Sequence, residues 1–277
     1  MSDLTPLTRE EYYLARMAGE DVQVPDPITR EEEYMKGIAD AINGDDDVEI
    51  PEPITREEEY MKNIANNVAS AGSDEQAMLD GIIDKTITSV SSNNVTKIGD
   101  NVFTSCTKLT KAVFPNVNII GGYAFNHCPE LATVNFPLAT YIDSDAFCVC
   151  KSLTMVEFPL VKIIGKNAFY GCTSLTTANF PNAIEIYTYA FRNCTSLTNF
   201  EISSEVTQIE ASAFTGCSSL ATIIMRPTTP PTLENVNAFT GLPNDYVIYV
   251  PNGSLSAYQA AAKWKDLASH IVEMPAE

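Results

Sequence analysis

The chain has 277 residues, 45% of them apolar, and its formal net charge is −19. This apolar content can form a core, which excludes wholesale disorder. No apolar run approaches the roughly 20 residues of a membrane-spanning helix, so membrane insertion is not expected. An acidic surface repels phosphate backbones, so nucleic acid is not expected as a partner.

The negative charge is concentrated at the start of the chain. Residues 1–85 contain 22 acidic and 7 basic residues, a net charge of −15, and the remainder has a net charge of −4. A domain boundary near Lys85 is therefore predicted. The first residues, MSDLTPLTREEYYLARMAGED, show none of the regions of a secretory signal. The expectation is a protein that stays in the cytoplasm or leaves the cell by lysis.

The acidic segment contains three copies of one short motif, LTREEYYLARMA, ITREEEYMKGIA and ITREEEYMKNIA, which begin at residues 7, 28 and 54. In each copy a threonine is followed three residues later by a glutamate, the capping-box pattern that starts a helix. Apolar side chains then recur with helical spacing, which predicts three short amphipathic helices within residues 1–72. Their candidate docking face consists of Tyr13, Leu14, Met17, Tyr34, Met35, Ile38, Tyr60, Met61 and Ile64.

Two interpretations of this segment stay open. Helices of about three turns are marginal alone in water, and the linkers between these are acidic and contain proline. The segment is either a small three-helix bundle or partly disordered tail, or a set of three docking peptides. In the second case each helix buries its apolar face in a groove of a partner, and the linkers make the binding multivalent. Residues 73–86 are predicted to form a helix that caps the following domain.

A second repeat, with a period of 22 residues and one step of 23, begins near residue 87 and continues to about residue 250. This period predicts a solenoid, in which each coil adds one short parallel strand beside that of the previous coil. In one coil Leu131, Val134 and Phe136 are expected to point inward. A degenerate seventh copy is expected at Ala238 and Phe239. The positions in register are Phe103, Phe125, Phe147, Phe169, Phe191 and Phe214, and Cys106, Cys128, Cys150, Cys172, Cys194 and Cys217.

The strand positions between the inward residues are expected to face solvent and to form a grid along one side of the solenoid. Extended solenoid faces commonly bind partners, but an inert solvated sheet would have the same pattern, and both interpretations stay open. The candidate recognition face consists of Lys111, Val113, Thr133, Asn135, Met155, Glu157, Thr177, Asn179, Asn199, Glu201, Thr222 and Ile224.

The sequence offers little that indicates catalysis. Six of the seven cysteines occupy one position per coil, which is typical of buried, reduced thiols that act as small apolar side chains. Cys148 is the exception and is either a core residue or an exposed reactive thiol. His127 occurs in one coil alone, so it is interpreted as a variable loop residue. No zinc spacing, nucleophile motif or phosphate loop is present. No enzyme activity, metal or cofactor is expected.

The repeat I-G-x-x-A-F-x-x-C-x-x-L-x-x-V-x-F-P, together with the ending IYVPNGSLSAYQAAAKWKDLASHIVEM, resembles the BspA-like subfamily of leucine-rich repeats. That family occurs in bacterial surface proteins and in phage-borne proteins. The resemblance implies a leucine-rich-repeat solenoid of short parallel β-strands, with mostly loop and turn on its other faces. It also implies a helix over the open end of the core. The expected organisation is an acidic segment of three short helices at 1–72, a capping helix at 73–86, repeats at 87–250 and a C-terminal cap at 251–277.

The TREE-Y motif of the first segment resembles short repeats at the start of virion-associated proteins from phages of gut Firmicutes. The resemblance implies a non-enzymatic phage virion protein, in which residues 1–72 dock to virion proteins and the solenoid contacts a host surface protein or glycan. The oligomeric state stays open: a homotrimer would fit a fibre, and a solenoid with capped ends can also be a monomer. The alternatives are a bacterial cell-surface adhesin and a cytoplasmic protein-binding scaffold.

Overall fold

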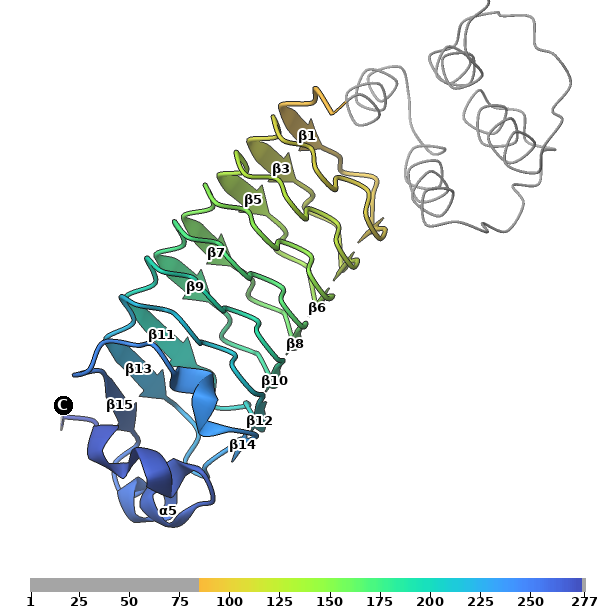
Figure 1. Cartoon of the computed structure of the whole chain (residues 1–277). Coiled ribbons are helices and arrows are strands. Elements are labelled where there is room, and N and C mark those ends of the chain that lie inside the picture. Colours follow the sequence, from red (N-terminus) through yellow and green to blue (C-terminus); the bar gives the residue numbers. More distant parts are fainter. Residues whose placement is uncertain (1–84, 276–277) are drawn as a thin grey trace, which may run out of the picture. The chain divides into compact units, whose positions relative to one another are not determined.

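The computed structural model describes residues 85–275 (Figure 1). The three predicted helices and their candidate docking face lie outside the described residues, and so does the predicted capping helix apart from Lys85 and Thr86. The chain divides into two units, at residues 1–87 and 88–277. The second unit is the predicted solenoid, and its fold class is confirmed.

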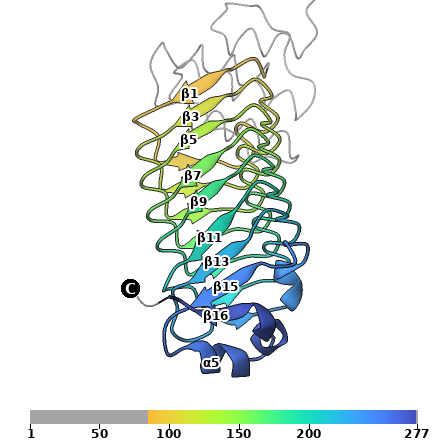
Figure 2. The same cartoon turned by 90° about the vertical axis from the view of Figure 1, so that its left-hand side faces the viewer.

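From β1 to β14, each coil of the solenoid contributes a strand to each of two sides (Figures 1 and 2), and the strand pairs of the described residues are parallel. One side, the long-strand face, consists of β1 (Ser89–Ser91), β3 (Lys111–Val113), β5 (Thr133–Asn135), β7 (Met155–Glu157), β9 (Thr177–Asn179), β11 (Asn199–Ile202), β13 (Thr222–Met225), β15 (Val247–Val250) and β16 (Ile271–Glu273).

The other side, the short-strand ladder, is one continuous sheet of two-residue strands. Each of its strands ends in a buried isoleucine or leucine, so a single side chain per coil anchors this side in the core. Its members are β2 (Lys97–Ile98), β4 (Ile119–Ile120), β6 (Tyr141–Ile142), β8 (Ile163–Ile164), β10 (Glu185–Ile186), β12 (Gln208–Ile209) and β14 (Thr232–Leu233).

Two stacks of phenylalanine rings run through the core. In the first, successive ring centroids are 4.9–5.9 Å apart, close to the spacing of about 4.8 Å between neighbouring strands. Rings of the second stack pack edge-on or tilted against the first. The first stack consists of Phe103, Phe125, Phe147, Phe169, Phe191, Phe214 and Phe239, and the second of Phe114, Phe136, Phe158 and Phe180.

The second stack changes its course after Phe180. At the next two coils Ile202 and Met225 occupy the position of the ring, and both are fully buried. Phe200, two residues before Ile202, occupies the inward strand position that Ala178 has in the previous coil, and its ring centroid lies 4.9 Å from those of Phe191 and Phe214. The aromatic volume is therefore moved by two residues within the strand and not lost, which keeps the core filled.

The cysteine ladder is tied to the backbone. The Sγ–H of Cys128 donates to the carbonyl oxygen of Phe103, one coil back, at 3.0 Å. The same bond recurs in the following coils at 3.1–3.2 Å. Each of these thiols thus fills a small core space and links two consecutive coils.

The C-terminal segment closes the open end of the core, as expected. It contains the 3₁₀ helix η1 (Val236–Phe239), α5 (Leu255–Ala260) and the 3₁₀ helix η2 (Trp264–His270). Trp264 packs 6.0 Å from the last ring of the first stack, and its Nε1–H donates to the carbonyl oxygen of Pro231 at 2.7 Å. β16 then pairs with β15, which adds a strand that the sequence did not predict. No helix among residues 85–275 is long and apolar enough to cross a membrane.

Two coils approach each other closely at Gly121, the glycine of one I-G pair. A Cβ atom on Gly121 would lie 2.8 Å from the Gly99 carbonyl carbon and the Ile98 carbonyl oxygen, both backbone atoms, whereas on Gly122 the nearest atom is 3.5 Å away. We expect Gly121→Ala to lower the free energy of unfolding by about 1–3 kcal/mol because the backbone must shift. Gly122→Ala is the matched control, and chemical denaturation measures both. Equal stabilities would contradict this account.

Candidate functional site

The structure places the candidate recognition face in two rows along the long-strand face. Hydrogen-bonded register aligns Lys111 with Thr133, and Met155 with Thr177, in one row. Glu157 aligns with Asn179 in the other row. Nine of the twelve side chains are exposed, while Val113, Thr222 and Ile224 are half-buried. The outward orientation expected from strand alternation is therefore present for the whole grid, with the least exposure towards the C-terminal coils.

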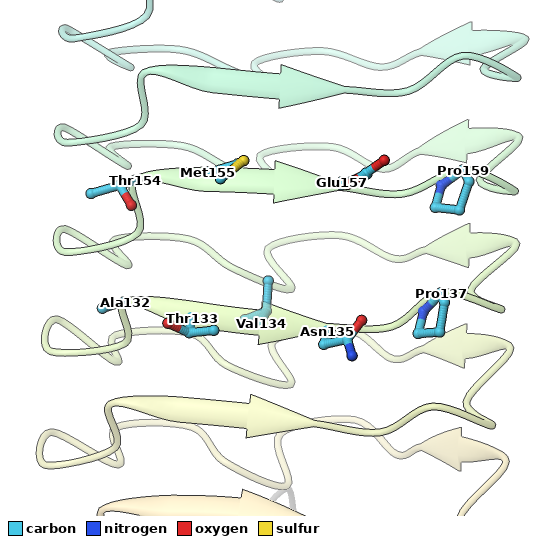
Figure 3. A pocket seen from close by; sticks show the side chains of 9 residues that line it. All are labelled: Ala132, Thr133, Val134, Asn135, Pro137, Thr154, Met155, Glu157 and Pro159. Atoms are coloured by element: carbon cyan, nitrogen blue, oxygen red, sulfur yellow. The ribbon is translucent and has the colours of Figure 1, made fainter.

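The long-strand face is interrupted between β5 and β7. The face is also interrupted between β9 and β11; at the first interruption β5 and β7 belong to different hydrogen-bonded sheets, β1-β3-β5 and β7-β9. A hollow of about 470 Å³ lies at this interruption. Figure 3 shows Val134 rising from β5 towards β7, beside Met155 and Glu157. The lining residues are Ala132, Thr133, Val134, Asn135, Pro137, Thr154, Met155, Glu157 and Pro159.

Val134 does not have the position expected from the repeat. The pattern predicts an inward valine, and the equivalent Ala112 and Val156 are buried, but Val134 is half-buried and lines the hollow. The prediction is wrong for this residue, whose side chain lines the hollow at the surface. Nothing in the sequence distinguishes Val134 from Val156, so the repeat pattern could not reveal the hollow.

Exposed apolar side chains gather in the two coils beside the hollow. Met155 is 59% exposed, Leu138 is 46% and Leu160 is 41%. In the coils before and after, asparagine replaces the leucine and links two coils, since the Nδ2 of Asn182 donates to the carbonyl oxygen of Pro159 at 2.7 Å. Asn116 makes the equivalent bond to Asn93 at 2.6 Å. The coils at the hollow thus have exposed apolar surface where their neighbours have a structural hydrogen bond.

The two carboxylates of the grid differ in their surroundings. Glu201 forms a two-pronged pair with Arg226, whose Nε and terminal nitrogen lie 2.8 and 3.2 Å from its two oxygens. Its charge is therefore largely neutralised on the surface. Glu157 forms no ion pair among residues 85–275 and is the sole charged side chain that lines the hollow. The free negative charge of this face is thus at the hollow.

The question that the sequence left open for Cys148 is answered by its burial, since only 7% of the residue is exposed. Burial, followed by the charge of Asp145 and a hydrogen bond to it, raises the pKa of this thiol to about 12. Burial likewise raises the pKa of Cys217 to about 12, and those of Cys150 and Cys194 well above their ordinary value. These thiols are protonated and unreactive at neutral pH.

The remaining candidate chemistry is also structural. His127 lies in a turn, and its Nδ1 is 2.9 Å from the side-chain oxygen of Asn126, which agrees with its interpretation as a loop residue. Within residues 85–275 no group of three or more histidine, cysteine or acidic side chains could hold a metal ion. The arrangement that this part of the chain presents is a surface for contact, with one hollow that combines apolar walls and a carboxylate.

The coil geometry, the inward leucine and phenylalanine positions and the parallel strand ladder define a leucine-rich-repeat solenoid, a class that generally serves as a non-enzymatic scaffold for protein interactions. The chain belongs to the BspA type leucine rich repeat family, whose model matches residues 83–181 and 140–252 with six copies of the repeat. Comparison with curated proteins gives no match.

Solved structures share this fold. A leucine-rich repeat protein from Bacteroides ovatus is 20% identical, with a TM-score of 0.50 over 69% of this chain and 55% of its own. A leucine rich cell surface protein from Faecalibacterium prausnitzii is 21% identical, with a TM-score of 0.43 over 65% of this chain and 64% of its own. A leucine-rich repeat protein from T. pallidum is 22% identical, with a TM-score of 0.43 over 66% of this chain and 82% of its own. This chain thus spans less than two thirds of the first two proteins.

The burial of the thiols predicts slow alkylation. In the folded chain, reaction of Cys148 with iodoacetamide at pH 8 is expected to be at least about a hundredfold slower than in denaturant, because the thiolate is the nucleophile. The rate should rise with pH and reach its plateau only near the pKa of about 12. Mass spectrometry of peptides from timed samples measures the rate. Rapid labelling of Cys148 at pH 8 would contradict its burial.

Proposed function

We propose that this protein is a non-enzymatic adhesion protein whose solenoid binds a protein or glycan on a host surface through the long-strand face. The centre of the binding surface is the hollow between β5 and β7. Buried thiols and a core filled by stacked rings fit a rigid module that presents a surface and carries out no reaction.

The observation that carries the proposal is the coincidence of three features in two adjacent coils. The sheet is interrupted between β5 and β7, and the hollow lies at the interruption. Met155, which lines the hollow, is exposed, and so are Leu138 and Leu160, which follow its lining prolines in the chain. Exposed apolar groups that gather at a concave place on a polar surface are typical of interaction sites. In these two coils leucine stands where asparagine forms a hydrogen bond between coils, so a hydrogen bond is absent and apolar surface is exposed. Such a replacement is expected at a contact surface and not on a sheet that faces only solvent.

For attachment, we propose that residues 1–72 dock to virion proteins of a phage through the candidate docking face. The three TREE-Y motifs support this proposal, because three linked copies of one helix increase the effective concentration of binding groups. The second candidate is a bacterial cell-surface adhesin, which membership of the BspA type family favours. A cytoplasmic scaffold is the third. The solenoid has the same role in all three.

A negative charge placed at the hollow tests the binding surface. The double variant Met155→Asp, Leu160→Asn is expected to weaken retention on immobilised mucin and on cells from the source culture at least tenfold, because it removes the exposed apolar contacts. The labelled full-length chain is measured over a range of concentrations. Asn199→Asp is the matched control, since it adds the same charge to the same row two coils away.

The result depends on the variants being folded, so both should first show the unfolding midpoint of the unchanged chain. Equal retention of the double variant and the parent would place the binding surface elsewhere. Loss of retention in the Asn199→Asp control as well would show that the binding surface is not centred on the hollow.

Deletion of residues 1–72 tests the attachment proposal. We expect the shortened chain to keep a cooperatively unfolding solenoid and to lose incorporation into particles, because the docking helices are gone. Quantitative mass spectrometry of density-purified particles, envelope and cytosol measures the distribution of the full and shortened chains. Full-length chain enriched in the envelope would favour the cell-surface adhesin, and cytosol alone would favour the scaffold. Retained incorporation of the shortened chain would overturn docking through this segment.

A further inference from the structure

The hollow between β5 and β7 combines two kinds of surface. Its apolar part comes from Val134, Met155 and the prolines Pro137 and Pro159. Glu157 supplies the charged part, on the same side of β7 as Met155 and two residues further along the strand (Figure 3). Two residues of a strand span about 7 Å, so apolar wall and carboxylate lie within the length of one extended side chain.

We propose that this hollow receives a lysine or arginine side chain of a protein partner, an inference that rests on the proposed function of the long-strand face. The aliphatic stem packs on Met155 and Val134, and the cationic head reaches the carboxylate of Glu157. Lysine and arginine combine these two properties, because their stems lie readily along apolar surface while the head stays at a polar group.

Charge decides between this occupant and others. A purely apolar side chain would cover Glu157 and leave a carboxylate without a partner, which costs free energy. An anionic group would be repelled by Glu157 and by the net charge of −4 on residues 86–277. Two cationic residues of this chain could be considered as partners of Glu157. Arg226 already pairs with Glu201, and Lys111 is on β3, which is separated from β7 by β5. The partner must therefore supply the positive charge.

The test uses the full chain labelled with ¹³C at the methionine methyl groups, and Met155→Leu identifies the signal of Met155. N-acetyl-arginine amide and N-acetyl-lysine amide are the probes, and N-acetyl-citrulline amide is the neutral control of similar shape. We expect the two cationic probes to shift the Met155 signal at millimolar concentration, and citrulline to shift it much less. Raising the salt concentration should weaken the effect, because the charge of Glu157 is exposed.

Two variants separate the carboxylate from general electrostatics. Glu157→Gln is expected to weaken binding of the cationic probes about fivefold, the range of an exposed ion pair. Glu205→Gln removes the same charge from the turn after β11 and should leave the binding of the cationic probes unchanged. Equal shifts with arginine and citrulline, or no shift of Met155 with any probe, would overturn the basic side chain as occupant. The adhesion proposal would still stand or fall with the Met155→Asp, Leu160→Asn experiment.

Discussion

Each coil of the solenoid must superimpose on its neighbours at the spacing of a parallel strand pair, about 4.8 Å. Every inward side chain is therefore stacked on the side chain at the same position of the next coil. Phenylalanine rings satisfy this condition at centroid distances of 4.9–5.9 Å in the first stack. The six cysteines satisfy it with volume small enough for the narrow positions, and five of their thiols also bond the coil behind. The period of the sequence is the direct consequence of this repeated contact.

Departures from the repeat are tolerated inside the core only when the filled volume is kept. Phe200 shows this, because it supplies a ring where Ile202 cannot. Outside the core there is no such requirement, so outward positions are free to change from coil to coil. Leu138 and Leu160 are examples of such a change and are exposed. At the same position of the next coil, Asn182 instead forms a hydrogen bond to the neighbouring coil. Variation of this kind is where a repeat protein acquires a particular surface.

The same packing buries the cysteines, the residues whose number in the composition suggests reactivity. Seven cysteines in one chain could form disulfides, bind a metal or act as nucleophiles, but all seven are buried and none forms a disulfide. Burial raises the pKa of Cys148 to about 12, so even the thiol outside the ladder is part of the structure. What the described part of the chain offers to other molecules is its shape, its exposed apolar groups and the charge of Glu157.

The sequence by itself determined the class of fold and most of the inward and outward positions of the strands, because these follow from side-chain alternation and from a repeat in register over six copies. The C-terminal cap was implied by the resemblance to the BspA-like repeats. Only the tertiary structure decided where the long-strand face is interrupted. The exposure of Val134 and the pairing of Glu201 with Arg226 depend on how neighbouring coils pack against one another. Those adjustments are small displacements between residues about 22 positions apart, and a one-dimensional pattern in which Val134 and Val156 are equivalent does not contain them.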